Sequence, residues 1–189
     1  MESLSKIFGS LARLKILRLF LFNQNSSLTI ADVAKRTKIS DDIVRRELAE
    51  LTSTDLLRKK GIRSAAKYQV YANFEHLAEL DTFIRDTTSV RPKDMLLALR
   101  KAGTLRLVAL SGFFTNVIES QIDLLVVGDN IEERVLASAV RSLEAELGRE
   151  IRYASFATAD FRYRLGVYDR LLRDVFDYPH RLLIDKLGL

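Results

Sequence analysis

The segment 29–53 restricts the fold of this chain most, because it contains two helix caps separated by a short stretch. Thr29 can cap a helix that runs to residue 37, and Ser40 can cap a second helix that runs to residue 53. Only two residues connect the first helix to the cap of the second, so the sequence predicts a tight turn between them. Three apolar residues at helical spacing would face inward from the second helix: Val44, Leu48 and Leu51.

A longer helix is expected before this pair and a basic hairpin after it. Apolar spacing predicts one amphipathic helix over residues 3–22, and SLTI is a candidate short strand. The long helix has more apolar surface than one stripe needs, which fits either a second subunit or domain, or burial on two sides within one domain: Ile16, Leu19, Phe20 and Phe22. LLRKK and KYQVY predict two strands joined by GIRSAA.

The remaining chain alternates between helix and strand. Asn73 is a candidate cap for a helix over 74–86, TTSVRP is a linker, and Pro92 suits the start of the next helix. Further elements are expected as strands 105–111, 122–127, 151–156 and 181–184, a helix over 131–147, and a helical stretch capped by Thr158 that reaches residue 176. This order predicts an α+β protein, with a first domain of helices and a hairpin over 1–75, connecting helices over 76–102, and a small α/β domain over 103–189.

Composition excludes several kinds of site. The chain has no cysteine, so disulfides and thiolate metal sites are ruled out, and two isolated histidines argue against a histidine metal cluster. We therefore predict no metal and no cofactor. The apolar run ILRLFLF is interrupted by Arg18 and lacks a cleavage site, and no uncharged run approaches the length of a membrane span. The expectation is a cytoplasmic protein with no membrane partner.

The positive charge is concentrated in the first part of the chain. Residues 1–80 contain 14 Lys and Arg against 9 Asp and Glu, whereas residues 81–189 contain 16 of each kind. A basic excess confined to one part favours a polyanionic partner for that part alone.

The order of long helix, short helix, tight turn, helix and basic hairpin is that of a winged helix-turn-helix, in which the helix after the turn enters the major groove of DNA. The exposed face of that helix would carry Asp41, Asp42, Arg45, Arg46 and Ala49. Arginine pairs bidentately with guanine, so Arg45 and Arg46 are the candidate base contacts. The hairpin residues expected to contact phosphates or the minor groove are Arg58, Lys59, Lys60, Arg63 and Lys67.

The same pattern is also compatible with roles that do not involve DNA. A run of charge is usually a solvated face, and a helix-turn-helix can serve protein interaction instead of DNA binding. Asp41 and Asp42 are moreover unfavourable beside phosphate. The element order, the basic hairpin and the charge distribution nevertheless all favour DNA binding. Double-stranded DNA is therefore the predicted partner.

The first part of the chain also resembles a known family. The segment FGSLARLKILRLFLFNQNSSLTIADVAKRTKISDDIVRRELAELTSTDLLRKKG resembles the winged-helix domain of small prokaryotic transcriptional regulators of the ArsR type. The resemblance covers residues 1–75 and implies a DNA-binding regulator, expected to be a homodimer. The metal-sensing cysteines of that family are absent, so metal regulation is not implied.

The second part resembles the minimal nucleotidyltransferase domain. The resemblance rests on SGFFTNVIESQIDLLVVGD, GREIRYASF and DYPHRLLI, and the combined architecture is similar to a class of predicted prokaryotic regulators. An active member has Gly-Ser at the head of a loop, Asp-x-Asp on one strand and a third carboxylate on a later strand. Alternate strand residues point to the same side, so such carboxylates can hold two Mg²⁺ ions for nucleotidyl transfer.

This sequence departs from the active pattern at several positions. Ser111 and Gly112 are present, but Phe113 occupies the serine position, and Gln121 replaces the first carboxylate. Only Asp123 remains of the pair, and IRYASF contains no carboxylate. We therefore predict a degenerate nucleotide site without catalytic residues. Asp123 alone is also consistent with an acid at the end of a strand that makes local hydrogen bonds.

A retained but inactive domain would serve assembly, nucleotide sensing or partner binding. The apolar loop residues favour a packed surface or a loop buried within the domain: Phe113, Phe114, Val117 and Ile118. Two alternatives stay open: a nucleotidyltransferase with a winged-helix targeting module, and an antitoxin-like interaction protein.

Overall fold

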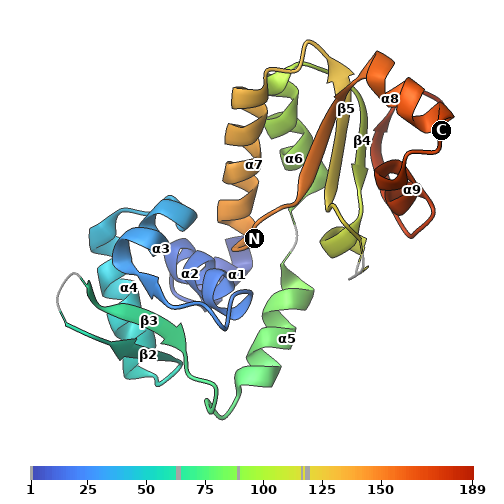
Figure 1. Cartoon of the computed structure of the whole chain (residues 1–189). Coiled ribbons are helices and arrows are strands. Elements are labelled where there is room, and N and C mark those ends of the chain that lie inside the picture. Colours follow the sequence, from blue (N-terminus) through green and yellow to red (C-terminus); the bar gives the residue numbers. More distant parts are fainter. Residues whose placement is uncertain (1, 63–64, 89, 116, 118–119) are drawn as a thin grey trace. The chain divides into compact units, whose positions relative to one another are not determined.

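The computed structural model describes all residues except Met1, 63–64, 89, 116 and 118–119. It is a mixed α+β protein, as expected. The chain divides into two compact units, the first formed by residues 1–90 with 141–149 and the second by residues 91–140 with 150–189 (Figure 1). Each unit contains one sheet.

Among the described residues, the first unit combines α1 to α5 and the second half of α7 (Glu133–Leu147) with a small antiparallel sheet. Its strands lie in the order β1-β3-β2, so the hairpin strands are paired and the short β1 adds to β3. Its elements are α1 (Glu2–Ile7), α2 (Leu11–Leu21), β1 (Leu28–Thr29), α3 (Ile30–Thr37), α4 (Asp41–Ser53), β2 (Leu57–Lys60), β3 (Lys67–Val70) and α5 (Leu77–Thr87).

The expected single helix over 3–22 is two helices. Gly9 has φ +88°, a left-handed conformation that interrupts the helical path. Ser10 then caps α2 by accepting a hydrogen bond from the backbone N–H of Arg13 at 2.9 Å. The apolar periodicity continues across this break, because both helices contribute to the apolar interior, and therefore it could not reveal the interruption.

The extra apolar surface of α2 is buried inside the first unit. Ile16, Leu19 and Phe20 are at most 1% exposed and belong to one hydrophobic core. The same core contains Val44, Leu48 and Leu51 of α4, as predicted. The unit that buries α2 also includes residues 141–149, which the sequence assigned to the other domain, and Arg18 of α2 donates a hydrogen bond to the Glu146 carbonyl at 3.0 Å.

Helices α3 and α4 have the predicted bounds, but their caps differ. Thr29 forms a capping box with Asp32: its hydroxyl accepts from the Asp32 N–H at 3.2 Å, and its own N–H donates to the Asp32 carboxylate at 2.9 Å. Ser40 precedes α4 but makes no capping hydrogen bond with its side chain. Lys38 makes the tight turn between the helices in a left-handed conformation, with φ +57°.

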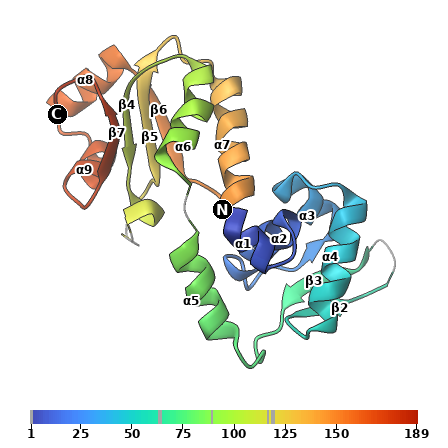
Figure 2. The same cartoon turned by 180° about the vertical axis from the view of Figure 1, so that it is seen from behind.

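The second unit is a four-stranded sheet in the order β6-β5-β4-β7, covered by helices on both faces. β5 and β6 are parallel, and the other pairs are antiparallel. Helix α6 and the start of α7 lie on one face, and α8 and α9 on the other (Figures 1 and 2). The elements are α6 (Pro92–Leu99), the 3₁₀ turn η2 (Arg100–Ala102), β4 (Thr104–Leu110), the 3₁₀ turn η3 (Gly112–Thr115), β5 (Leu124–Asp129), α7 (Glu133–Leu147), β6 (Tyr153–Ala157), α8 (Thr158–Gly166), α9 (Arg170–Phe176) and β7 (Arg181–Asp185).

Two expected caps were wrong. Helix α5 begins at Leu77 after His76, so Asn73 is not its cap. Thr158 is the first residue of α8 and not the residue before it. The stretch to residue 176 is two helices, because Tyr168 adopts φ +55° and Asp169 starts a new helix by accepting hydrogen bonds from two backbone N–H groups.

In the described part of the chain, no helix combines the length and apolar character needed to cross a membrane.

The contrast between the two caps gives a first prediction. Thr29→Ala removes a side-chain hydrogen bond to the end of α3 and should lower the free energy of unfolding by about 1 kcal/mol. Ser40→Ala is the matched control and should cost clearly less, because the Ser40 side chain makes no such bond. Urea denaturation followed by circular dichroism measures both. Equal losses would contradict the difference between the two caps.

Candidate functional site

The exposed face of α4 carries the polar residues expected from the sequence. Asp41, Asp42, Arg45, Arg46 and Ala49 are all exposed, whereas Val44 and Leu48 on the opposite face are fully buried. The ion pairs found among the described residues include none that joins the acids of this face to its arginines. The face therefore presents charges of both signs without pairing them.

Helix α4 is held in place by a buried carboxylate that sequence analysis missed. Glu47 has a side chain only 4% exposed, and its Oε2 accepts a hydrogen bond from Nε of Arg13 at 2.8 Å. Its Oε1 accepts from the Ser10 hydroxyl at 2.9 Å. Because Ser10 also caps α2, the start of α2 and the middle of α4 are fixed to one another. The only sequence signal was an acid at an inward position of an amphipathic helix.

The hairpin β2–β3 concentrates positive charge in the first unit. Lys59, Lys60 and Lys67 are exposed, and Arg63 lies outside the described residues. Lys60 and Lys67 are direct partners across the two antiparallel strands. Like charges placed opposite each other destabilise a strand pair. An anion bound between them would remove that repulsion.

Arg58 differs from the other basic residues of the hairpin. Its guanidinium lies 4.0 Å from the centre of the Tyr71 ring and forms an ion pair with Asp55 at 3.1 Å. These two contacts hold the side chain at the base of β2 and partly offset its charge. Arg58 is thus a weaker candidate for a phosphate contact than the three lysines.

The second candidate site is centred on Asp123, which directly precedes β5 and is 1% exposed. Its Oδ1 accepts hydrogen bonds from the Phe113 N–H at 2.8 Å and from Nη2 of Arg152 at 2.8 Å. Its Oδ2 accepts from the Arg152 N–H at 3.0 Å and from Nε of the same arginine at 3.1 Å. Both carboxylate oxygens are therefore occupied, and Arg152 binds in a bidentate manner.

These contacts decide the ionisation of the pair. Burial by itself raises the pKa of Asp123. The hydrogen bonds from the Arg152 side chain and from the two backbone N–H groups lower it by more than burial raises it, so the pKa lies below its usual value. The hydrogen bond to Asp123 raises the pKa of Arg152. The pair is thus ionised as a mutually neutralising unit, which sequence analysis could not find because its members are far apart along the chain.

Ser111 and Gly112 shape the turn around this carboxylate. The Ser111 hydroxyl donates to the Ile122 carbonyl at 2.7 Å, and the residue is buried. Gly112 has φ +52°, and a Cβ there would collide with the Asp123 carboxylate and lie 2.9 Å from the Ile122 carbonyl oxygen. Only glycine fits this position, because the backbone must approach the carboxylate closely. Both residues therefore build the loop that encloses Asp123.

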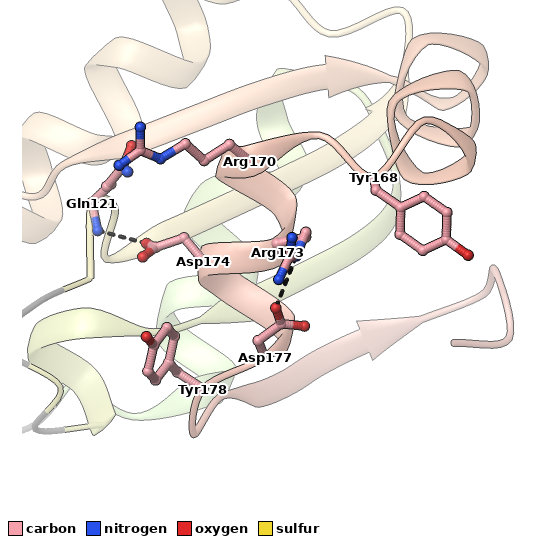
Figure 3. Close-up of a pocket in the computed structure, with 7 residues that line it drawn as sticks. All are labelled: Gln121, Tyr168, Arg170, Arg173, Asp174, Asp177 and Tyr178. Atoms are coloured by element: carbon pink, nitrogen blue, oxygen red, sulfur yellow. Dashed lines mark hydrogen bonds and ion pairs between the residues drawn. The ribbon is translucent and has the colours of Figure 1, made fainter.

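Gln121 lies in a different environment from Asp123. It is exposed, its backbone N–H donates to Asp174 of α9 at 2.7 Å, and it borders an open depression of about 550 Å³ (Figure 3). The remaining lining residues come from α9 and its flanks: Tyr168, Arg170, Arg173, Asp174, Asp177 and Tyr178. Asp123 is not among them. Positions 121 and 123, which hold the carboxylate pair in the active pattern, are thus not brought together. Both precede β5, so their side chains do not follow the alternation of a strand.

The apolar loop is half-buried. Phe113 and Phe114 contact each other edge to face, with ring centroids 5.4 Å apart, and Val117 is also half-buried. Ile118 lies outside the described residues. No group of three or more His, Cys, Asp or Glu positioned to hold a metal ion occurs within the described ranges.

The Asp123–Arg152 pair gives a second prediction. Arg152→Met leaves a buried carboxylate without its cation and should lower the free energy of unfolding by about 2 kcal/mol at neutral pH. Arg106→Met is the matched control: Arg106 pairs with Asp129 at 2.8 Å, but both side chains are about 40% exposed, so about 0–1 kcal/mol is expected.

The effect of Arg152→Met should also depend on pH. Because the pKa of Asp123 is lowered in the folded protein, its stabilisation is present above the ordinary carboxyl pKa of about 4 and is lost as pH falls through the folded value. The difference between wild type and Arg152→Met should therefore shrink in acid. Urea titrations at several pH values test this, and a difference that stays constant down to low pH would contradict it.

Comparison of the whole chain with protein-family models, with curated proteins and with solved structures finds no match. The contacts and charges of its own residues are therefore the grounds for assigning a function.

Proposed function

We propose that the protein is a sequence-specific DNA-binding transcriptional regulator. The first unit acts in this proposal as a winged helix-turn-helix, with α4 in the major groove and β2–β3 as the wing. The observation that carries the proposal is the exposed lysine cluster of the wing, where Lys60 lies directly opposite Lys67. A phosphate backbone would relieve this repulsion and be bound by the lysines, because it carries negative charge along its whole length.

Helix α4 supports the same assignment. A helix that enters a groove must keep its orientation while its exposed side chains contact bases, and the Ser10, Arg13 and Glu47 contacts fix α4 from its buried side. On the exposed side, Arg45 and Arg46 extend without an ion pair among the described residues. Arginine in this position binds guanine through two hydrogen bonds.

For the second unit we propose a nucleotidyltransferase-like domain that no longer performs metal-dependent transfer and serves assembly, nucleotide sensing or partner binding. The support comes from Asp123, the one retained carboxylate, which is saturated by Arg152 and by backbone N–H groups. A metal ion would have to displace a bidentate arginine from a buried carboxylate. The alternative of a working nucleotidyltransferase needs at least two free carboxylates at one point.

The DNA-binding proposal predicts distinct effects for two groups of residues. Lys59→Ala with Lys60→Ala should weaken binding to every duplex and flatten its dependence on salt, since fewer counterions are released. Arg45→Ala or Arg46→Ala should relax base preference, at roughly 1–3 kcal/mol for each lost bidentate contact. Fluorescence anisotropy with labelled duplexes at several salt concentrations measures both effects.

A matched control is Lys93→Ala with Lys101→Ala, which removes two positive charges from the second unit. Its binding and salt dependence should stay close to those of the wild type. The absence of duplex binding by the wild-type protein even at low salt would refute the proposal.

The proposal for the second unit predicts no Mg²⁺-dependent nucleotide transfer by the wild-type protein. Gln121→Asp with Phe113→Ser restores the family residues, but no tight binding of Mg²⁺ and ATP is expected, because position 121 and Asp123 are not brought together and Arg152 occupies the Asp123 carboxylate. Calorimetric titration of ATP and Mg²⁺ into the wild type and this double variant tests the expectation. Labelling of a substrate by the wild-type protein that a chelator abolishes would overturn the proposal.

A further inference from the structure

The acids on the exposed face of α4 need an explanation that DNA binding alone does not give. Asp42 lies at the N-terminal end of the face, where helix-turn-helix proteins contact base edges, and a carboxylate there is repelled by phosphates. Asp42, Arg46 and Ala49 follow one another at helical spacing, opposite the buried Val44 and Leu48. Around the helix axis, Asp42 therefore lies at the centre of the exposed face, although along the axis it lies in the first turn.

Among the described residues, Asp42 and Arg46 form no ion pair, and neither do Asp41 and Arg45 one residue earlier on the same helix, whereas several pairs of this spacing on other helices do. Asp81–Arg85, Asp160–Arg164 and Arg173–Asp177 form ion pairs at 2.6, 3.1 and 3.1 Å. Acid four residues before a base is the favourable order for such a pair on a helix. Within the part of the chain that the structure describes, Asp42 and Arg46 form no ion pair, so both side chains are available to a ligand.

The two side chains can hydrogen-bond to two bases of adjacent base pairs: Arg46 to a guanine and Asp42 to a cytosine. Arginine donates two hydrogen bonds to guanine, and a carboxylate accepts one from the N4 amino group of cytosine. Neighbours four residues apart on a helix have Cβ atoms about 5–6 Å apart, which lets them reach adjacent base pairs. Ala49 on the next turn is small and lets the helix approach the groove closely.

On the basis of the proposed DNA binding, we propose that Asp42 is a specificity-determining residue that selects cytosine next to a guanine bound by Arg46. Its carboxylate accepts the N4 amino proton of that cytosine and repels every site that offers no donor there. Asp42 therefore lowers affinity for unrelated DNA as well as favouring the correct site. The wing lysines supply the general attraction against which this selection operates.

The experiment is selection of bound sequences from a pool of random duplexes by the full-length protein. The wild type should enrich a motif with adjacent cytosine and guanine. Asp42→Asn should change the selected cytosine to adenine, because an amide pairs with the N6 and N7 edge of adenine. Asp42→Ala should lose preference at that position by about tenfold and bind unrelated duplexes more tightly.

Glu50→Gln is the matched control, since it removes one exposed acidic charge near the other end of the same helix. Its selected motif should equal that of the wild type, and thermal melting confirms that each variant is folded. A purely structural Asp42, acting on the helix dipole, would change stability without changing the motif, so an unchanged motif in Asp42→Asn overturns the inference.

Two further outcomes separate this inference from the proposed function. A wild-type protein that binds duplexes without any preferred motif would overturn base selection by Asp42 and leave DNA binding standing. A wild-type protein that binds no duplex at low salt would refute the proposed function itself.

Discussion

The neutralised pair of Asp123 and Arg152 determines the organisation of the second unit around its loop. One buried carboxylate connects the turn η3, the start of β5 and the start of β6, because its four hydrogen-bond donors come from Phe113 and Arg152. Removing a charge from water is costly unless it is paired and hydrogen-bonded. The loop, the two strand ends and the arginine therefore have to assemble together.

Local signals in the sequence were sufficient to predict helix bounds where a capping residue is followed by apolar residues at helical spacing. Helices α3 and α4 were predicted with their observed bounds, and Pro92 correctly marked the start of α6. The break at Gly9 was missed, because apolar spacing continues across it. Glu47 and Arg152 could not be assigned from sequence either, since their partners lie 34 and 29 residues away and are defined only by tertiary packing.

The first unit combines a rigid scaffold with unpaired charge. Contacts of Glu47 fix α4 from its inner side, and Arg58 is held by Tyr71 and Asp55. The hairpin residues Lys59, Lys60 and Lys67, by contrast, lie on strands whose register pairs Lys60 with Lys67. Glu47 and Arg58 are thus each paired with an opposite charge, whereas the three hairpin lysines form no ion pair among the described residues.

Gly112 limits how this chain can change over evolutionary time. Any other residue there would collide with Asp123 and with the Ile122 carbonyl, and would also strain a backbone at φ +52°. Loss of Asp123 would leave Arg152 without its counter-charge, while loss of Arg152 would leave a buried carboxylate. Each single substitution should give a less stable protein. In natural variants of this chain, Gly112, Asp123 and Arg152 should therefore be kept together or replaced together.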